Sequence, residues 1–310
     1  MMDEKIKRDV KVWLNFGLFF VGVMLLLGGA TRLTGSGLSM VTWDLLWGVF
    51  PPFSESAWEE FFQSYKQSPE YLKINFTMDI EGFKKIFWLE YLHRLMGRFL
   101  GLYFLWPLLI KKSPKYLMWG FVLICFQGFW GWLMVKSGLK NIPHVNPFFL
   151  SVHLMLAASL VVWIIWQCQD RPKIGAIDVL YIGMIFIEIF LGGLVAGFKA
   201  GYIYNTFPLM EGAWFPSEVA TVSDLWLTAE GVQWLHRVWA MAVLMIIGRF
   251  AFLRRSELLF FCLGAQILLG IFTLLFKVPL LLGLLHQLNA FVLLGFTVFL
   301  IFLKKVERKA

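Results

Sequence analysis

Charged residues are scarce in this chain of 310 residues. Only 15% of the residues are Asp, Glu, Lys or Arg, whereas 59% are hydrophobic, including 32 Phe and 15 Trp. A typical soluble domain has about 25% charged residues and could not cover this much apolar surface. The composition excludes an ordinary soluble protein and indicates a protein that crosses a membrane.

Cysteine is also rare. Cys125, Cys168 and Cys262 each stand alone within an apolar segment or at its end, and no two share an external loop. We therefore expect no structural disulfide and no metal held by thiolates. Small apolar packing residues are the simplest interpretation of all three.

Apolar runs of about 20 residues, the length that crosses a bilayer, recur about eight times. They are expected near residues 12–31, 90–110, 117–135, 148–168, 177–197, 232–251, 257–276 and 280–303. The first run has no small-residue cleavage site, so a retained helix is predicted instead of a signal or transit peptide. The sequence predicts an all-α membrane protein with eight transmembrane helices.

Basic residues are depleted from alternate loops, which predicts the orientation because cytoplasmic loops retain positive charge. They gather at both ends of the chain and in the loops after the second, fourth and sixth helices: Lys5, Lys7, Arg8, Lys11, Lys111, Lys112, Lys115, Arg171, Lys173, Arg254, Arg255, Lys304, Lys305, Arg308 and Lys309. Both termini are predicted to be cytoplasmic, in a bacterial inner (plasma) membrane. This distribution explains the net charge of +8, and nucleic acid is not expected as a partner.

The chain contains an internal repeat. The matched pairs are Gly28 with Gly192 and Thr42 with Thr206 at an offset of 164, His93 with His236 at 143, Gln127 with Gln266 at 139, and His153 with His286 at 133. The offset shrinks because the first half carries an insertion, mostly within 53–85. We predict two tandem four-helix bundles, 1–170 and 171–310, related by a pseudo-two-fold axis along the membrane normal. Chance similarity between Leu- and Phe-rich helices is the alternative.

Four of the five histidines, His93, His153, His236 and His286, are these matched residues. The predicted topology places all four in one layer toward the outer face. Two imidazoles on neighbouring helices can hold a haem between them. Zinc and copper fit less well because they recruit Cys, carboxylate or closely spaced His. A single membrane histidine is more often a packing residue, whereas four at matched positions favour ligands. His144 has no counterpart and is expected to face solvent.

Arginines accompany two of these histidines. Arg94 and Arg237 directly follow His93 and His236, and Arg98 lies one turn beyond Arg94. A guanidinium group suits a haem propionate, since it can bind a carboxylate through two hydrogen bonds. The alternative is that these cations only extend toward the membrane edge.

The two halves differ at one carboxyl group. Glu90 precedes His93 by three residues on the same helix face, where the second half has Gln233 before His236. A carboxyl group partly inside the bilayer is a functional candidate, although Glu90 could instead cap the start of its helix. The first half is therefore predicted to be reactive, and the second to hold a haem or pass electrons.

A second intramembrane carboxyl group is Glu188. It precedes Gly192 by four residues, which is the spacing of Gln127 to Gly131 and of Gln266 to Gly270. We interpret Glu188 as a protonated or hydrogen-bonded packing residue.

These motifs resemble the haem A synthase family of cytochrome oxidase assembly, in the branch shared by proteobacteria and mitochondria that lacks external cysteine pairs. The matching segments are 28–38, Glu90-x-x-His93-Arg94, His153, 193–197, 204–212, Gln233-x-x-His236-Arg237 and 285–287. They cover nearly the whole chain in a specific order.

The resemblance implies oxidation of the C8 methyl group of haem O to a formyl group by successive hydroxylation, which gives haem A for cytochrome c oxidase. It implies that His236 and His286 ligate a resident haem b. His93 and His153 would flank the substrate haem, and Glu90 would act at the reacting methyl group. A haem O synthase that supplies the substrate and an unidentified electron donor are the implied partners, and a homo-oligomer is left open.

Two other functions remain open from the residues alone. A dihaem b-type quinol oxidoreductase also needs four membrane histidines, but would not need Glu90. A haem transporter or chaperone would hold haem transiently on the same histidines.

Overall fold

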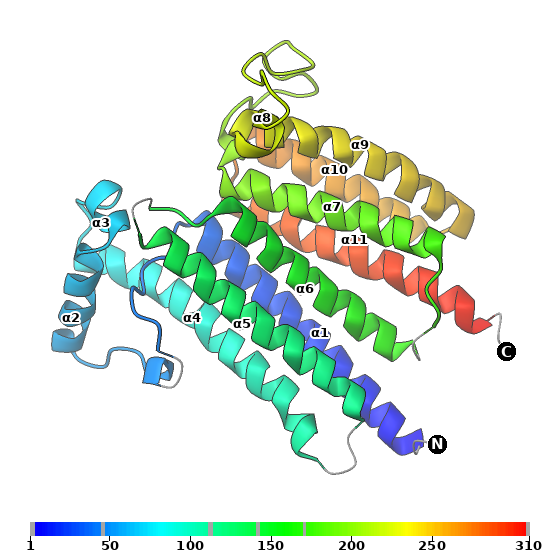
Figure 1. The fold of residues 1–310 in the computed structure, drawn as a ribbon, viewed down its shortest axis with the longest axis horizontal. Coiled ribbons are helices and arrows are strands. Elements are labelled where there is room, and N and C mark those ends of the chain that lie inside the picture. The colour runs from blue at the N-terminus through cyan, green and yellow to red at the C-terminus, as the bar shows by residue number, and fades with distance from the viewer. Residues whose placement is uncertain (1–3, 45–46, 111–113, 141–142, 170–171, 308–310) are drawn as a thin grey trace. The chain divides into compact units, whose positions relative to one another are not determined.

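The structure, a computed structural model, describes residues 4–44, 47–110, 114–140, 143–169 and 172–307. These residues form helices joined by loops, with an isolated β-bridge between Met210 and Ala213 (Figure 1). The helices are α1 (Glu4–Leu33), α2 (Glu55–Lys66), α3 (Pro69–Lys73), α4 (Ile80–Leu105), α5 (Met118–Gly138), α6 (Pro147–Cys168), α7 (Ala176–Gly197), α8 (Asp224–Leu227), α9 (Ala229–Arg254), α10 (Glu257–Leu275) and α11 (Leu280–Glu307), with the short 3-10 turns η1 (Trp47–Val49), η2 (Trp106–Leu109), η3 (Lys115–Leu117) and η4 (Ala200–Tyr202). The all-α prediction is confirmed for the described residues.

Seven helices among the described residues are long and apolar enough to cross a membrane. They are α1, η3 together with α5, α6, α7, α9, α10 and α11 as far as Leu303. Helix α4, which covers most of the span expected near 90–110, is not among them. It has sufficient length, but it carries Glu90, Arg94 and Arg98 within its apolar part.

Several predictions fall on residues outside the described ranges. These residues are Lys111, Lys112, Arg171, Arg308 and Lys309 of the topology prediction, together with the boundary between 170 and 171 of the two predicted halves.

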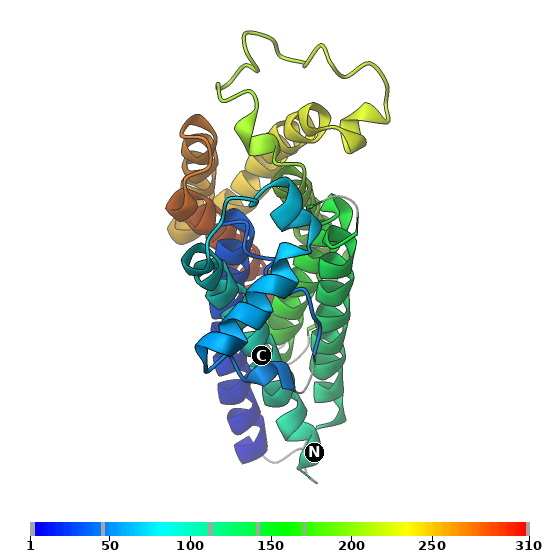
Figure 2. The same ribbon diagram turned by 90° about the vertical axis from the view of Figure 1, so that its left-hand side faces the viewer.

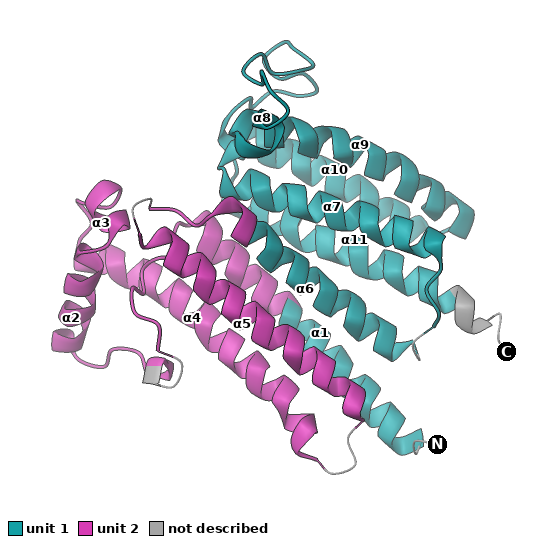
Figure 3. Cartoon of the chain, viewed as in Figure 1, with its two compact units in different colours: residues 1–21, 150–310 teal, residues 22–149 magenta. Residues whose placement is uncertain are grey.

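The chain forms two compact units, 1–21 with 150–310 and 22–149 (Figure 3). In the unit of 1–21 and 150–310, α7 packs against α9 and α11. Helix α10 also packs against α9 and α11, so the four helices form a closed ring. Thr228 and Ser256 begin α9 and α10 by accepting backbone N–H groups of Gly231 and Leu259. The loop between η4 and α8 projects beyond these helices (Figures 1 and 2).

In the unit of 22–149, α4 begins at Ile80, about ten residues before the start of the span expected near 90–110. Asp79 caps it by accepting the N–H of Gly82, and its added turns pack against α2. The resulting aromatic cap has a buried cluster of Met40, Trp58, Phe62, Tyr65, Phe83, Phe87 and Tyr91. The insertion predicted within 53–85 is therefore a small folded element with its own core (Figure 2).

Polar side chains complete the aromatic cap. The Tyr65 hydroxyl donates to Glu70 at 3.1 Å and accepts from Asn75 at 2.7 Å. Burial raises the pKa of the Tyr65 phenol, so this group keeps its proton and remains a donor. The first bond gives the buried Glu70 carboxyl group a donor, and the two together tie α3 and the following turn to α2.

Phe83→Ala is expected to destabilise the aromatic cap by about 3–5 kcal/mol. Phe83 is 0% exposed and stacks at 5.2 Å on both Phe62 and Tyr65, so its removal leaves a cavity at the centre of the cluster. Limited proteolysis of 53–79 measures the loss. Phe76→Ala is the matched control, because Phe76 is 65% exposed and its removal should leave cleavage unchanged. Equal cleavage of both variants would contradict a cap held by its own core.

Candidate functional site

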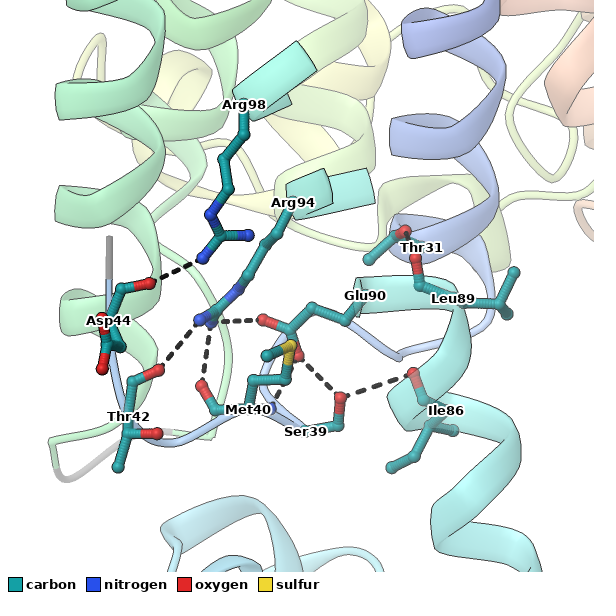
Figure 4. Close-up of polar contacts among 10 residues, drawn as sticks. All are labelled: Thr31, Ser39, Met40, Thr42, Asp44, Ile86, Leu89, Glu90, Arg94 and Arg98. Carbon is teal, nitrogen blue, oxygen red and sulfur yellow. Dashed lines mark hydrogen bonds and ion pairs between the residues drawn. The ribbon is translucent and has the colours of Figure 1, made fainter. Parts of the chain in front are cut away.

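Glu90 is buried in the third turn of α4 and binds the loop that follows α1 (Figure 4). Its Oε2 accepts the Ser39 hydroxyl at 2.7 Å and the Met40 N–H at 2.8 Å, and its Oε1 lies 2.6 Å from the Arg94 guanidinium. Since Asp79 is the N-cap of α4, the alternative interpretation of Glu90 as a helix cap is wrong. A carboxylate can accept about four hydrogen bonds, so the three donors leave one acceptor position open.

The two arginines of α4 extend this contact along the loop (Figure 4). Arg94 donates to the carbonyl oxygens of Thr42 at 2.9 Å and Met40 at 2.8 Å, and Arg98 donates to that of Asp44 at 2.6 Å. These bonds hold the backbone of 40–44 against α4. The loop is thereby fixed beside Glu90.

The second half repeats this clamp at matched positions. Arg237 donates to the carbonyl oxygens of Thr206 at 3.0 Å and Tyr204 at 2.7 Å, and these residues match Thr42 and Met40 at the offset of 164. Its guanidinium also lies 3.4 Å from Gln233 Oε1, which matches the contact of 2.6 Å between Arg94 and Glu90 Oε1. The repeated bonds involve backbone atoms that composition does not select, and they support the internal duplication.

Glu90 in the first half and Gln233 in the second differ because their side chains meet opposite hydrogen-bonding groups of the loops they contact. Gln233, which is 2% exposed like Glu90, donates through Nε2 to the carbonyl oxygens of Ala200 at 2.8 Å and Ile203 at 2.7 Å. Glu90 accepts from its loop, whereas Gln233 donates to its loop. A carboxylate in place of Gln233 would face two carbonyl oxygens without a donor, which is costly when buried.

Three of the four predicted histidines lie against a glycine of the preceding long helix in their own unit. A Cβ atom on Gly28 would lie 3.2 Å from His93 Nε2, and one on Gly192 would lie 3.5 Å from His236 Cε1. A Cβ on Gly270 would lie 2.9 Å from His286 Cε1, which is closer than such atoms normally approach. The glycines spaced from Glu188 and Gln266 therefore make room for the imidazole rings.

His236 of α9 and His286 of α11 form a facing pair. Their ring centroids are 6.4 Å apart and their planes are inclined by 88°. Metal–imidazole bonds are about 2 Å long, so rings at this separation suit one iron between two Nε2 atoms. The pair lies within the ring of α7, α9, α10 and α11, where helical bundles commonly hold haem.

The other ring nitrogens of this pair meet side chains that were not assigned to the site. Nδ1 of His236 is 3.1 Å from Glu188 Oε1, and Nδ1 of His286 is 3.3 Å from Gln266 Nε2. The Gln266 carbonyl accepts from Asn289 at 2.8 Å. The interpretation of Glu188 as a packing residue misses this contact. Its signal is the spacing of four residues before a glycine, which Glu188 shares with Gln266, the side chain beside the other imidazole.

A buried donor beside His236 also fits a haem. The Nε of Arg237 has no hydrogen-bond partner among the described residues, although the other guanidinium nitrogens hold the loop. A propionate would satisfy this donor. In the first half, Arg94 and Arg98 donate to carbonyl oxygens of the loop 40–44. Their role as partners of a propionate remains a prediction.

The remaining histidines are placed as follows. His93 is in α4 within the unit 22–149, and His153 is in α6 within the other unit, so their pairing remains a prediction. His144 is exposed, as expected.

Known proteins resemble this chain over most of its length. The sequence model of a family described as Cytochrome oxidase assembly protein matches residues 11–298. A protein named Heme A synthase from Ehrlichia canis is 37% identical, over 96% of this chain and 94% of its own length. Two others with that name are each 39% identical: one from Paramagnetospirillum magneticum, over 93% of this chain and 91% of its own, and one from Nitrosospira multiformis, over 94% and 92%.

Proposed function

The chain belongs to the cytochrome oxidase assembly protein family, and on that premise we propose that it is a haem A synthase that oxidises the C8 methyl group of haem O to a formyl group. The enzyme would be an oxidoreductase acting on a C–H group, by successive hydroxylation. The observation that carries the proposal is the facing pair of His236 and His286 in the half that has Gln233, together with an ionisable Glu90 in the half that has His93. A cofactor site and a reactive site are thus distinguished by their residues.

We assign His236 and His286 as axial ligands of a resident haem b, with Arg237 Nε as the donor to a propionate. When bound there, this haem would supply single-electron transfer. The chain itself contributes the spacing of the two imidazoles, the glycines that admit them and the buried donor. These residues would hold the group in the bundle of α7, α9, α10 and α11.

We assign the substrate haem to His93 and His153, with Glu90 as the catalytic residue and Arg94 and Arg98 as further propionate partners. Glu90 has one free acceptor position beside its bonds to Arg94, Ser39 and Met40. A carboxyl group in this position could take a proton as the methyl group is oxidised. Its three donors hold it in a single orientation beside the substrate position.

We propose that α4 also crosses the membrane, which makes eight transmembrane helices with α4 as the second in chain order. The charges that lower its hydropathy are paired inside the protein, since Glu90 binds Arg94 and Arg98 binds a loop carbonyl. With eight spans, both termini lie in the cytoplasm of a bacterial inner membrane, the histidine layer faces outward, and 1–170 and 171–310 are the two halves. A haem O synthase, an electron donor and a second copy of this chain are the proposed partners.

Expression in a bacterium that makes haem O but no haem A tests this function. Haem extracted from the membranes and separated chromatographically should contain haem A only in cells that carry the chain. The same cells with an empty vector are the control. Haem O that persists unchanged beside abundant, haem b-loaded protein would contradict the proposal.

A further inference from the structure

The two imidazoles of the facing pair are held by chemically different side chains. The Glu188 carboxyl group lies 3.1 Å from His236 Nδ1, whereas the Gln266 amide lies 3.3 Å from His286 Nδ1. Glu188 comes from α7 and Gln266 from α10, at the same spacing of four residues before the glycine that faces each ring. The facing pair therefore consists of two identical imidazoles, but a carboxyl group lies behind one and an amide behind the other.

This difference affects the ring nitrogens. A carboxyl oxygen 3.1 Å from Nδ1 favours the His236 tautomer that carries its proton on Nδ1, which leaves Nε2 free for a metal. The Gln266 nitrogen that faces His286 can only donate, and its oxygen accepts from Asn289, so Gln266 offers His286 Nδ1 no acceptor for a proton. A carboxylate acceptor also makes the imidazole a stronger donor to a metal, as in other histidine sites with a carboxylate behind them.

We propose that Glu188 is a positioning residue that selects the metal-binding tautomer of His236 and lowers the reduction potential of the resident haem. The proposal rests on the proposed haem b site. Glu188 would contact no substrate and acts through His236. Its Oε2 has no hydrogen-bond partner among the described residues and is buried, so the nearest described partner of the carboxyl group is the imidazole.

The first half keeps Gln127 at the position of Gln266 but lacks counterparts of Glu188 and Asn289. Position 24 matches Glu188 at the offset of 164 and is Met, and position 156 matches Asn289 at 133 and is Leu. Asn289 holds the Gln266 amide by donating at 2.8 Å and also donates to the Cys262 carbonyl at 2.9 Å. A group bound in the second half is thus held by supported ligands, as a resident cofactor requires. The first half has apolar residues at both positions, which suits a haem that must leave.

The test uses the purified, haem b-loaded protein and measures the reduction midpoint potential optically, with the spectrum of the oxidised low-spin haem as a second readout. Glu188→Gln should retain the haem and raise the midpoint, because an amide is a weaker acceptor than a carboxylate. Gln266→Glu should lower it, because a second carboxylate then supports His286. Glu257→Gln removes an exposed carboxylate at the start of α10 and should leave the midpoint unchanged.

Midpoint shifts of opposite sign in Glu188→Gln and Gln266→Glu would support the proposal. Unchanged midpoints in both, with haem retained, would overturn it. If Glu188→Gln does not accumulate as folded protein, Gln266→Glu decides: a lower midpoint supports the proposal and an unchanged one overturns it. These potentials do not depend on haem A formation. A protein that shows the shifts but makes no haem A would refute only the proposed activity, and one that makes haem A without the shifts would refute only the role of Glu188.

Discussion

Replacing Glu90 with Gln is expected to reduce haem A formation by at least about 100-fold, the scale of a lost general base. Gln has nearly the same shape, but it cannot take a proton and offers only one oxygen to the three donors that surround the carboxylate. The rate of haem A formation from haem O measures the loss, at matched protein and haem b content. The haem b spectrum should be unchanged, because its proposed ligands lie on α9 and α11.

Ser39→Ala is the matched control for Glu90. It removes a single bond of 2.7 Å to Oε2 and keeps the carboxylate and its contact with Arg94. If the carboxylate acts on the substrate, Ser39→Ala should lower the rate far less than Glu90→Gln does, because one donor is lost while the carboxylate itself remains. Equal losses in the two variants would mean that Glu90 serves only to hold the loop of 39–44, and the catalytic role would be withdrawn.

Loss of the resident haem is the second large effect expected. His236→Ala and His286→Ala should each reduce the haem b content of the purified protein to a small fraction of the wild-type value. Each variant leaves one imidazole of a pair whose rings are 6.4 Å apart, so the iron would keep a single axial ligand. Haem extracted as its pyridine complex and counted per protein measures the content.

His93→Ala and His144→Ala provide the contrast. His93 lies in the unit 22–149 on α4, and His144 is exposed in the loop before α6. Both variants should keep the haem b spectrum, and His93→Ala should lose haem A formation. A b-type spectrum that survives in His236→Ala but is lost in His93→Ala would reverse the assignment of the two halves.

The candidate site was partly predictable from the sequence. The matched positions of His93 and His236 and the exchange of Glu90 for Gln233 could be read from offsets alone. The contact of Glu188 with His236 could not, because His236 lies 48 residues away on another helix. The folding of α2 and α3 into a cap on α4 was also missed, since an insertion in a repeat alignment shows where residues are added but not what they pack against.

The sequence by itself determined the all-α class, the positions of seven apolar spans, the repeat and the identity of the histidines, because hydropathy and spacing are properties of the chain order. The tertiary structure decided what each polar side chain contacts. It brought His236 and His286 to a separation that suits one iron, placed Glu188 behind one of them, and turned Glu90 and Gln233 toward loops of opposite hydrogen-bonding character. These contacts join residues that are 20 to 50 positions apart in the sequence, and only packing of the helices brings such residues together.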